Sequence, residues 1–170
     1  MRSIVAGDAE AFERWYRDNA PRLRAFLRHL LLGNEQAAED VMQEAFIQIW
    51  RRPHGFDPDR GSLRGYLFGV ARKLAVTWSR RHRPADEINS EASICMSVET
   101  SSLLANALDQ LQPDQRAILW LREVEGQSYS ELAAILEIPI GTVRSRLHNA
   151  REALRAVWLN AEHGAVGRSR

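Results

Sequence analysis

Apolar residues recur at three- and four-residue steps along most of this 170-residue chain, and the alternation typical of strands is nearly absent. This spacing gathers apolar side chains on one side of a helix. The chain is therefore predicted to be all-α. The expected helices cover about residues 8–32, 35–51, 63–82, 101–111, 113–124, 128–136 and 139–159.

Residues 84–100, "PADEINSEASICMSVET", interrupt this pattern because they are acidic, begin with a proline and contain few large apolar residues. They are predicted to form a flexible linker between two small helical domains. A three-helix bundle is expected in residues 1–83 and a four-helix domain in residues 101–160, with a frayed tail at 161–170. Pro21 is expected to kink or split the first helix.

Charge is distributed unevenly although the net charge is only +1. Residues 51–83 carry nine basic and two acidic residues, whereas residues 84–115 carry six acidic residues and no basic one. Residues 139–158 carry four arginines and one glutamate. Two basic blocks predict two surfaces that face a polyanion. Arginine supplies 22 of the 23 basic side chains, which suits phosphate and guanine contacts but also follows from codon bias.

Several classes of protein are disfavoured by what the sequence lacks. Cys95 is the single cysteine, so the chain cannot form a disulfide or a CxxC metal site by itself. No catalytic constellation, phosphate loop or cluster of metal ligands is visible, and His148 stands alone. We expect no catalytic residue, cofactor or metal. No apolar run is long enough to cross a membrane and no signal peptide is evident, so a cytoplasmic protein without membrane insertion is expected.

Residues 128–154, "SYSELAAILEIPIGTVRSRLHNAREAL", join a short helix to a longer one. Ser128 and Glu131 have the spacing of a capping box, and Pro139 suits the first position of the next helix. The segment is predicted to be a helix-turn-helix, whose second helix enters the DNA major groove. Glu137 departs from the pattern because it stands in the turn, where glycine is common.

The second helix separates an apolar seam from a polar face. Arginine can bind guanine edges and asparagine can pair with adenine, so this face has the chemistry of a base reader. The alternative is an ordinary solvated face, which the capped partner helix and tight turn disfavour. The seam comprises Val143, Leu147, Ala150, Leu154 and Val157, and the face comprises Arg144, Ser145, His148, Asn149 and Arg151, with Arg146 at its margin.

Three segments together resemble the extracytoplasmic-function (ECF) subgroup of the sigma-70 family. They are "AAEDVMQEAFIQIWRR", "GSLRGYLFGVARKLAVTWSRRHR" and "LDQLQPDQRAILWLREVEGQSYSELAAILEIPIGTVRSRLHNARE". The resemblance covers about residues 8–158 and implies a promoter-specificity subunit of bacterial RNA polymerase. Residues 1–83 would be region 2, which binds core polymerase and the −10 element. Residues 101–160 would be region 4, which binds the −35 element and the polymerase flap.

The resemblance also implies roles for individual residues. Asp40, Gln43 and Glu44 would contact core polymerase, although an acidic solvated face is their alternative. The −35 contacts would be Arg144, Ser145, Arg146, His148, Asn149 and Arg151, with Arg122 and Tyr129 holding the DNA backbone. The −10 contacts would be Phe56, Arg60, Arg64, Arg72, Lys73 and Arg80; Trp78 fits the buried stripe of its helix better than a stacking role.

Other expectations concern partners and regulation. Subgroup members are commonly held by an anti-sigma factor, so one is expected here. The acidic linker either threads a basic polymerase channel or is a plain tether, and Cys95 is either incidental or a redox sensor. Two other functions remain as alternatives. One is a stand-alone helix-turn-helix regulator, disfavoured by the basic block at 51–83, and the other is a helical protein-interaction adaptor.

Overall fold

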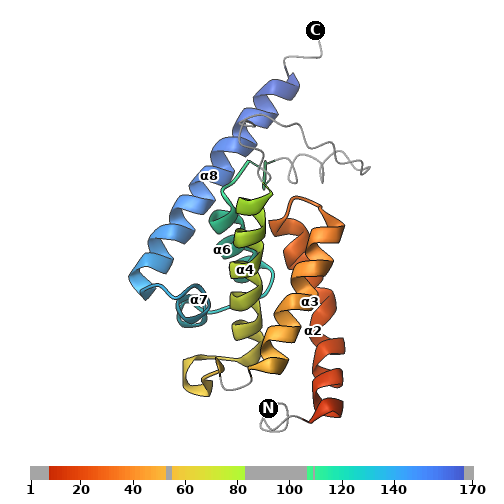
Figure 1. The fold of residues 1–170 in the computed structure, drawn as a ribbon. Coiled ribbons are helices and arrows are strands. Elements are labelled where there is room, and N and C mark those ends of the chain that lie inside the picture. Colours follow the sequence, from red (N-terminus) through yellow and green to blue (C-terminus); the bar gives the residue numbers. More distant parts are fainter. Residues whose placement is uncertain (1–7, 53–54, 83–106, 109, 167–170) are drawn as a thin grey trace.

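The computed structural model describes residues 8–52, 55–82, 107–108 and 110–166, and these residues form an all-α structure without strands (Figure 1). The predictions for the linker, for Cys95 and for most of the helix at 101–111 lie outside the described residues. The sequence order is α2, α3, the 3-10 turn η2, α4, α6, α7 and α8.

Three long helices build the amino-terminal bundle: α2 (Ala9–Leu30), α3 (Glu35–Arg51) and α4 (Leu63–Arg81). At the start of each helix, a short polar side chain accepts a hydrogen bond from the backbone amide three residues later, as an N-cap does. These caps are Asp8, Asn34 and Ser62. Pro21 lies inside α2 without ending it, so the predicted split does not occur.

The core of this bundle is apolar and aromatic. Phe26 and Phe68 are fully buried with ring centroids 5.1 Å apart, which joins α2 to α4. Phe46 of α3 meets Trp15 and Tyr16 of α2 at 5.4 and 4.5 Å between centroids. Trp78 is half-buried against the core, as the stripe predicted, and it also stacks on His82.

The carboxy-terminal unit consists of α6 (Pro113–Glu123), α7 (Tyr129–Leu136) and α8 (Ile140–Val166). Pro113 is the first residue of α6, and reciprocal bonds between Gln112 and Gln115 form its capping box. The prediction that the chain frays from residue 161 placed the end of α8 too early, because the helix continues to Val166.

The two units pack directly against each other through α4 with α7 and α2 with α6 (Figure 1). Buried apolar residues form one continuous core that runs through both units. At Gly69 of α4, an added Cβ would lie 3.0 Å from the backbone oxygen of Ile135 in α7. A residue without a side chain is therefore required for this approach of α7 to α4.

Candidate nucleic-acid interface

The helix-turn-helix is built as its sequence predicts. The hydroxyl of Ser128 accepts a bond from the amide of Glu131 at 3.2 Å, and the Glu131 carboxylate accepts one from the amide of Ser128 at 2.7 Å. These bonds lower the pKa of Glu131, and the nearby Arg64 adds a smaller effect. Glu137 ends α7 in the left-handed conformation, with φ of 55°. The turn therefore uses the geometry that usually favours glycine.

The second helix, α8, shows the predicted division of faces. Val143, Leu147 and Ala150 are fully buried against α6 and α7. The opposite side is open to solvent, which is the arrangement a groove-reading helix needs. Its exposed residues are Arg144, Ser145, Arg146, His148 and Asn149.

Arg151 is also exposed, but its guanidinium group is bonded to the neighbouring helix α6. Its Nη2 donates to Glu123 Oε1 at 2.6 Å, and hydrogen bonds to Glu123 and Tyr129 raise its pKa. Arg122 donates to the backbone oxygen of Gln127 at 2.7 Å and lies 5.2 Å from the centre of the Tyr129 ring. Arg122, Tyr129 and Arg151 thus form one cluster at the junction of α6, α7 and α8.

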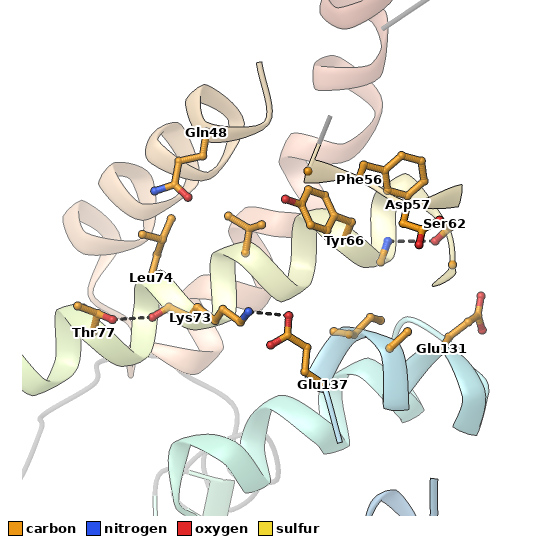
Figure 2. Close-up of a pocket in the computed structure, with 16 residues that line it drawn as sticks. Gln48, Phe56, Asp57, Ser62, Tyr66, Lys73, Leu74, Thr77, Glu131 and Glu137 are labelled. Atoms are coloured by element: carbon orange, nitrogen blue, oxygen red, sulfur yellow. Dashed lines mark hydrogen bonds and ion pairs between the residues drawn. The ribbon is translucent and has the colours of Figure 1, made fainter. Parts of the chain in front are cut away.

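The basic loop and helix at 51–83 line a hollow of about 420 Å³ between α4 and α7 (Figure 2). Phe56 and Tyr66 lie on its wall with ring centroids 5.9 Å apart. Lys73 points across the hollow to Glu137, with Nζ 2.7 Å from Oε1 (Figure 2).

The other predicted −10 residues are distributed along α4. Arg72 Nη1 lies 2.9 Å from Asp114 Oδ1, and only 14% of the Arg72 side chain is exposed. Arg64 is half-buried near Glu131 of α7. Arg80 lines a second hollow of about 410 Å³ near the start of α6. Arg60 belongs to the 3-10 turn η2 (Pro58–Arg60), and its side chain is outside the described part. Three of the six predicted −10 residues thus lie near carboxylates of the carboxy-terminal unit: Arg64, Arg72 and Lys73.

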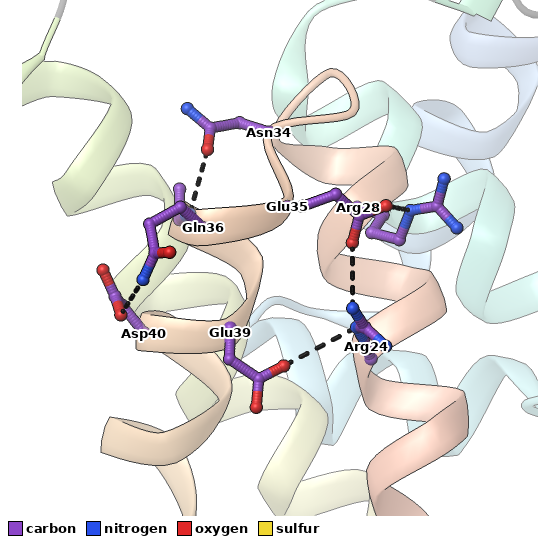
Figure 3. Close-up of polar contacts among 8 residues, drawn as sticks. Arg24, Arg28, Asn34, Glu35, Gln36, Glu39 and Asp40 are labelled. Carbon is purple, nitrogen blue, oxygen red and sulfur yellow. Dashed lines mark hydrogen bonds and ion pairs between the residues drawn. The ribbon is translucent and has the colours of Figure 1, made fainter.

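The predicted polymerase-binding residues share the exposed side of α3. Asp40 accepts a bond from Gln36 at 3.0 Å, and Glu44 accepts one from Gln48 at 3.0 Å (Figure 3 shows the first pair). Gln43 is exposed between them. Glu39, in contrast, turns toward α2 and pairs with Arg24 at 3.6 Å (Figure 3).

Two apolar residues extend this exposed side of α3. Trp50 was expected in the buried stripe, but 42% of it is exposed and its ring lies at the edge of the core against Phe12. Ile47 is 40% exposed and follows Gln43 and Glu44 by one helical turn. The sequence signal for Ile47 was available, because it lies off the stripe of period 3.6 formed by its buried neighbours.

The contact between the two units was not foreseen from sequence. His29 of α2 stacks on Trp120 of α6, with centroids 4.9 Å apart. Burial, with a smaller effect of Arg116, lowers the pKa of His29 to about 4. Arg116 is buried and donates to the backbone oxygen of Leu30 at 3.3 Å. Arg22 lies 3.7 Å from Glu125, whose side chain is only 3% exposed.

Two other features are absent from the residues that the structure describes. No group of three or more histidine, cysteine, aspartate or glutamate side chains is placed to hold a metal ion in that part of the chain. Among the same residues, no helix has the length and apolar character needed to cross a membrane.

Comparison with known proteins gives consistent matches along the chain. The family model for sigma-70 region 2 matches residues 15–85, and that for sigma-70 region 4 matches residues 101–154. The ECF RNA polymerase sigma factor SigE of Mycolicibacterium smegmatis is 34% identical over 89% of this chain, which spans 64% of that protein. The ECF RNA polymerase sigma-E factor of Escherichia coli K12 is 33% identical, covering 68% of this chain and 70% of its own length.

A solved structure also superposes on this fold. CnrH, in complex with the cytosolic domain of CnrY, matches with a TM-score of 0.72 and 26% identity, covering 94% of each chain.

Proposed function

Because the chain belongs to the ECF subgroup of the sigma-70 family of RNA polymerase sigma factors, we propose that it binds core polymerase, recognises the −10 and −35 elements and promotes promoter opening. The polymerase supplies the chemistry of RNA synthesis, so the chain is a transcription initiation factor and not an enzyme. Its place of action is the cytoplasm, where the polymerase and the chromosome lie.

The observation that carries this proposal is the exposed polar face of α8 above a buried seam. Arg144 and Arg146 are the strongest candidates to contact bases or phosphates in the −35 element, because both residues are exposed and a guanidinium group can make bidentate contacts. The contacts of Arg122, Tyr129 and Arg151 connect α6, α7 and α8. We propose that these three residues hold the junction of α6 and α8 in place against the DNA backbone.

The amino-terminal bundle would serve the other two partners. The exposed side of α3, with Asp40, Gln43 and Glu44, is proposed to bind core polymerase, and Ile47 and Trp50 offer apolar contacts beside it. The loop before α4 and the cations of α4 are proposed to hold the −10 strand. Aromatic and arginine side chains at this point suit unstacked bases and phosphates.

A regulatory partner is proposed by analogy with CnrH, which was solved bound to the cytosolic domain of CnrY. We propose that an anti-sigma factor similarly binds this chain. Co-purification with a candidate partner, followed by loss of transcription on adding it, tests this part.

Run-off transcription with purified core polymerase and a randomised promoter library tests the main proposal. Wild-type protein should select a two-part promoter. Arg144→Ala with Arg146→Ala should weaken −35 recognition by about 2–6 kcal/mol, given about 1–3 kcal/mol for each base-reading arginine. The matched control, Arg14→Ala with Arg17→Ala, removes two exposed arginines of α2 that pair only locally with Glu10 and Glu13. The absence of any initiation by folded wild type would overturn the function.

A further inference from the structure

Three consecutive exposed residues form the carboxyl end of α3: Trp50, Arg51 and Arg52, here called the α3 terminus. Trp50 is 42% exposed. Within the part of the chain that the structure describes, neither arginine has a carboxylate partner. Arg14 and Arg17 of α2 are exposed too, but each pairs with a glutamate four residues earlier. The α3 terminus therefore offers an indole and two guanidinium groups to an external ligand.

The indole of Trp50 is held in place by a cluster of aromatic side chains. Its ring centroid lies 4.8 Å from that of Phe12 in α2. Phe12 in turn lies 5.7 Å from Trp15 and 6.3 Å from Phe46, which is buried. Because the ring is already fixed by its neighbours, a flat ligand that stacks on it pays little to order it.

The charge changes sign along the exposed side of α3. Asp40 and Glu44 lie in its first half, Ile47 follows, and Arg51 lies one helical turn further on the same side. The acidic half repels a polyanion, whereas the end with Arg51 and Arg52 attracts one. The α3 terminus and the acidic surface proposed to bind core polymerase therefore suit different ligands.

The α3 terminus directly adjoins the loop that is proposed to hold the −10 strand. The amide of Gly55 donates a hydrogen bond to the Arg52 carbonyl oxygen at 3.0 Å. Gly55 and Phe56 then line the hollow of about 420 Å³. Helix α3 ends at the same end of the bundle as this loop (Figure 1). A strand held in the loop can thus continue onto the α3 terminus without crossing another helix.

We infer that the α3 terminus is a second single-stranded DNA site, which holds the opened strand immediately downstream of the −10 element. Trp50 stacks on an unpaired base, and Arg51 and Arg52 bind phosphates of the same strand. The inference rests on the proposed function for the role of the adjoining loop. The downstream side follows from the neighbouring polymerase surface of α3, because RNA synthesis starts inside the polymerase, downstream of the −10 element.

This second site differs from the −10 and −35 readers in what it recognises. Every base has a face that can stack on an indole, and a phosphate carries no sequence information. The α3 terminus should therefore stabilise the opened strand of any promoter that the other two surfaces select.

A photochemical cross-link tests the contact directly. Full-length protein is bound to purified core polymerase and to promoter DNA selected by run-off transcription. 5-Iodouracil, which couples to aromatic rings on irradiation, replaces one base at a time between the −10 element and the start site. Peptide mapping should place a cross-link on Trp50 for at least one position. Transcriptionally active complexes without any cross-link to Trp50 would overturn the inference.

Variants of Trp50 measure the stacking. Trp50→Leu keeps an apolar side chain against Phe12 but removes the flat ring, and Trp50→Phe keeps a smaller ring. Loss of one stacked base corresponds to about 5- to 150-fold in affinity. Affinity for promoter DNA with a pre-melted bubble should fall by that factor in Trp50→Leu and by less in Trp50→Phe. Equal affinity of wild type and Trp50→Leu would contradict stacking.

The arginines are tested through the salt dependence of the same affinity. The slope of log affinity against log salt concentration is about −0.7 for each phosphate neutralised on a single strand. Arg51→Gln with Arg52→Gln should therefore make the slope shallower by about 1.4. The matched control, Arg14→Gln with Arg17→Gln, removes the same charge from α2 and should leave the slope unchanged. The same change of slope in both double variants would show a general charge effect and overturn the phosphate contacts.

Binding of core polymerase without DNA separates this site from a polymerase contact. Trp50→Leu should bind core polymerase as wild type does, whereas Ile47→Ala should bind it more weakly. A loss of core affinity in Trp50→Leu that accounts for its whole loss of promoter affinity would assign Trp50 to polymerase and overturn the inference. Folded wild type that directs no transcription would overturn the proposed function, whereas normal transcription by Trp50→Leu would overturn only the second site.

Discussion

Glu137 illustrates how one residue carries two opposing effects. Its left-handed backbone disfavours a side chain, while its carboxylate pairs with Lys73 at 2.7 Å. An exposed ion pair contributes only about 0.2–1 kcal/mol, comparable to the conformational cost. Glu137 is therefore expected to have little net effect on the free energy of unfolding, and what it adds is an ion pair between the two units.

Two substitutions at this position should affect stability differently. Glu137→Gly relieves about 1 kcal/mol of backbone strain and loses the ion pair, so urea unfolding should show a small gain or no change. Glu137→Gln keeps the strain and loses the pair, so the protein should lose up to about 1 kcal/mol. Equal effects of the two variants would show that the left-handed backbone carries no cost here.

At the scale of helices, caps define the elements and buried seams hold them together. Asn34, Ser62 and Ser128 each accept the bond that starts a helix. The packing of α2 on α6 depends instead on a stacked pair, His29 with Trp120, beside the buried Arg116. A protonated His29 would place two positive charges side by side at this contact.

This helix contact should weaken as the pH falls. The His29 pKa is about 4 when α2 packs on α6, against an ordinary value of 6.5, so this packing favours neutral histidine. The stabilisation that neutral His29 gives to the contact between α2 and α6 is complete above pH 6.5, and it declines as the pH falls from 6.5 toward 4. At pH 5 the loss is about 2 kcal/mol by linkage.

The measurement is urea unfolding of wild type and His29→Phe at pH 7 and pH 5. The phenylalanine keeps an aromatic ring against Trp120 but cannot be protonated. His29→Phe should therefore lose less stability than wild type between the two pH values. The same loss in both proteins would mean that His29 is not the group responsible.

At the scale of the whole molecule, the two units share one buried core although their sequences match separate family models. A shared core couples the unfolding of its parts. Gly69 lies at the closest backbone approach between α4 and α7, so it is the position where that coupling can be removed with one methyl group.

Calorimetry should reveal this coupling. Wild type should unfold in a single transition at low salt, whereas Gly69→Ala should show two. The transition of the α2–α4 bundle should move upward in the variant, because alanine stabilises a helix interior by up to about 1 kcal/mol relative to glycine. A single transition in both proteins, at a lower temperature in the variant, would indicate damage to one unit and not separation of two.

Local sequence signals explain which features of the fold could be predicted. The capping box at Ser128, the proline starting α6 and the seam of α8 act within one or two helical turns, and the sequence alone predicts them. Trp50 is the exception, because period 3.6 places it near the stripe while α3 ends at the margin of the core.

The sequence by itself determined the helices, the helix-turn-helix and the faces that carry charge, because caps and periodicity are properties of neighbouring residues. The tertiary structure alone decided that Lys73 meets Glu137 and Arg72 meets Asp114, pairs separated by 64 and 42 residues. No local sequence pattern encodes such contacts, since they depend on how α7 packs against Gly65 and Gly69 of α4.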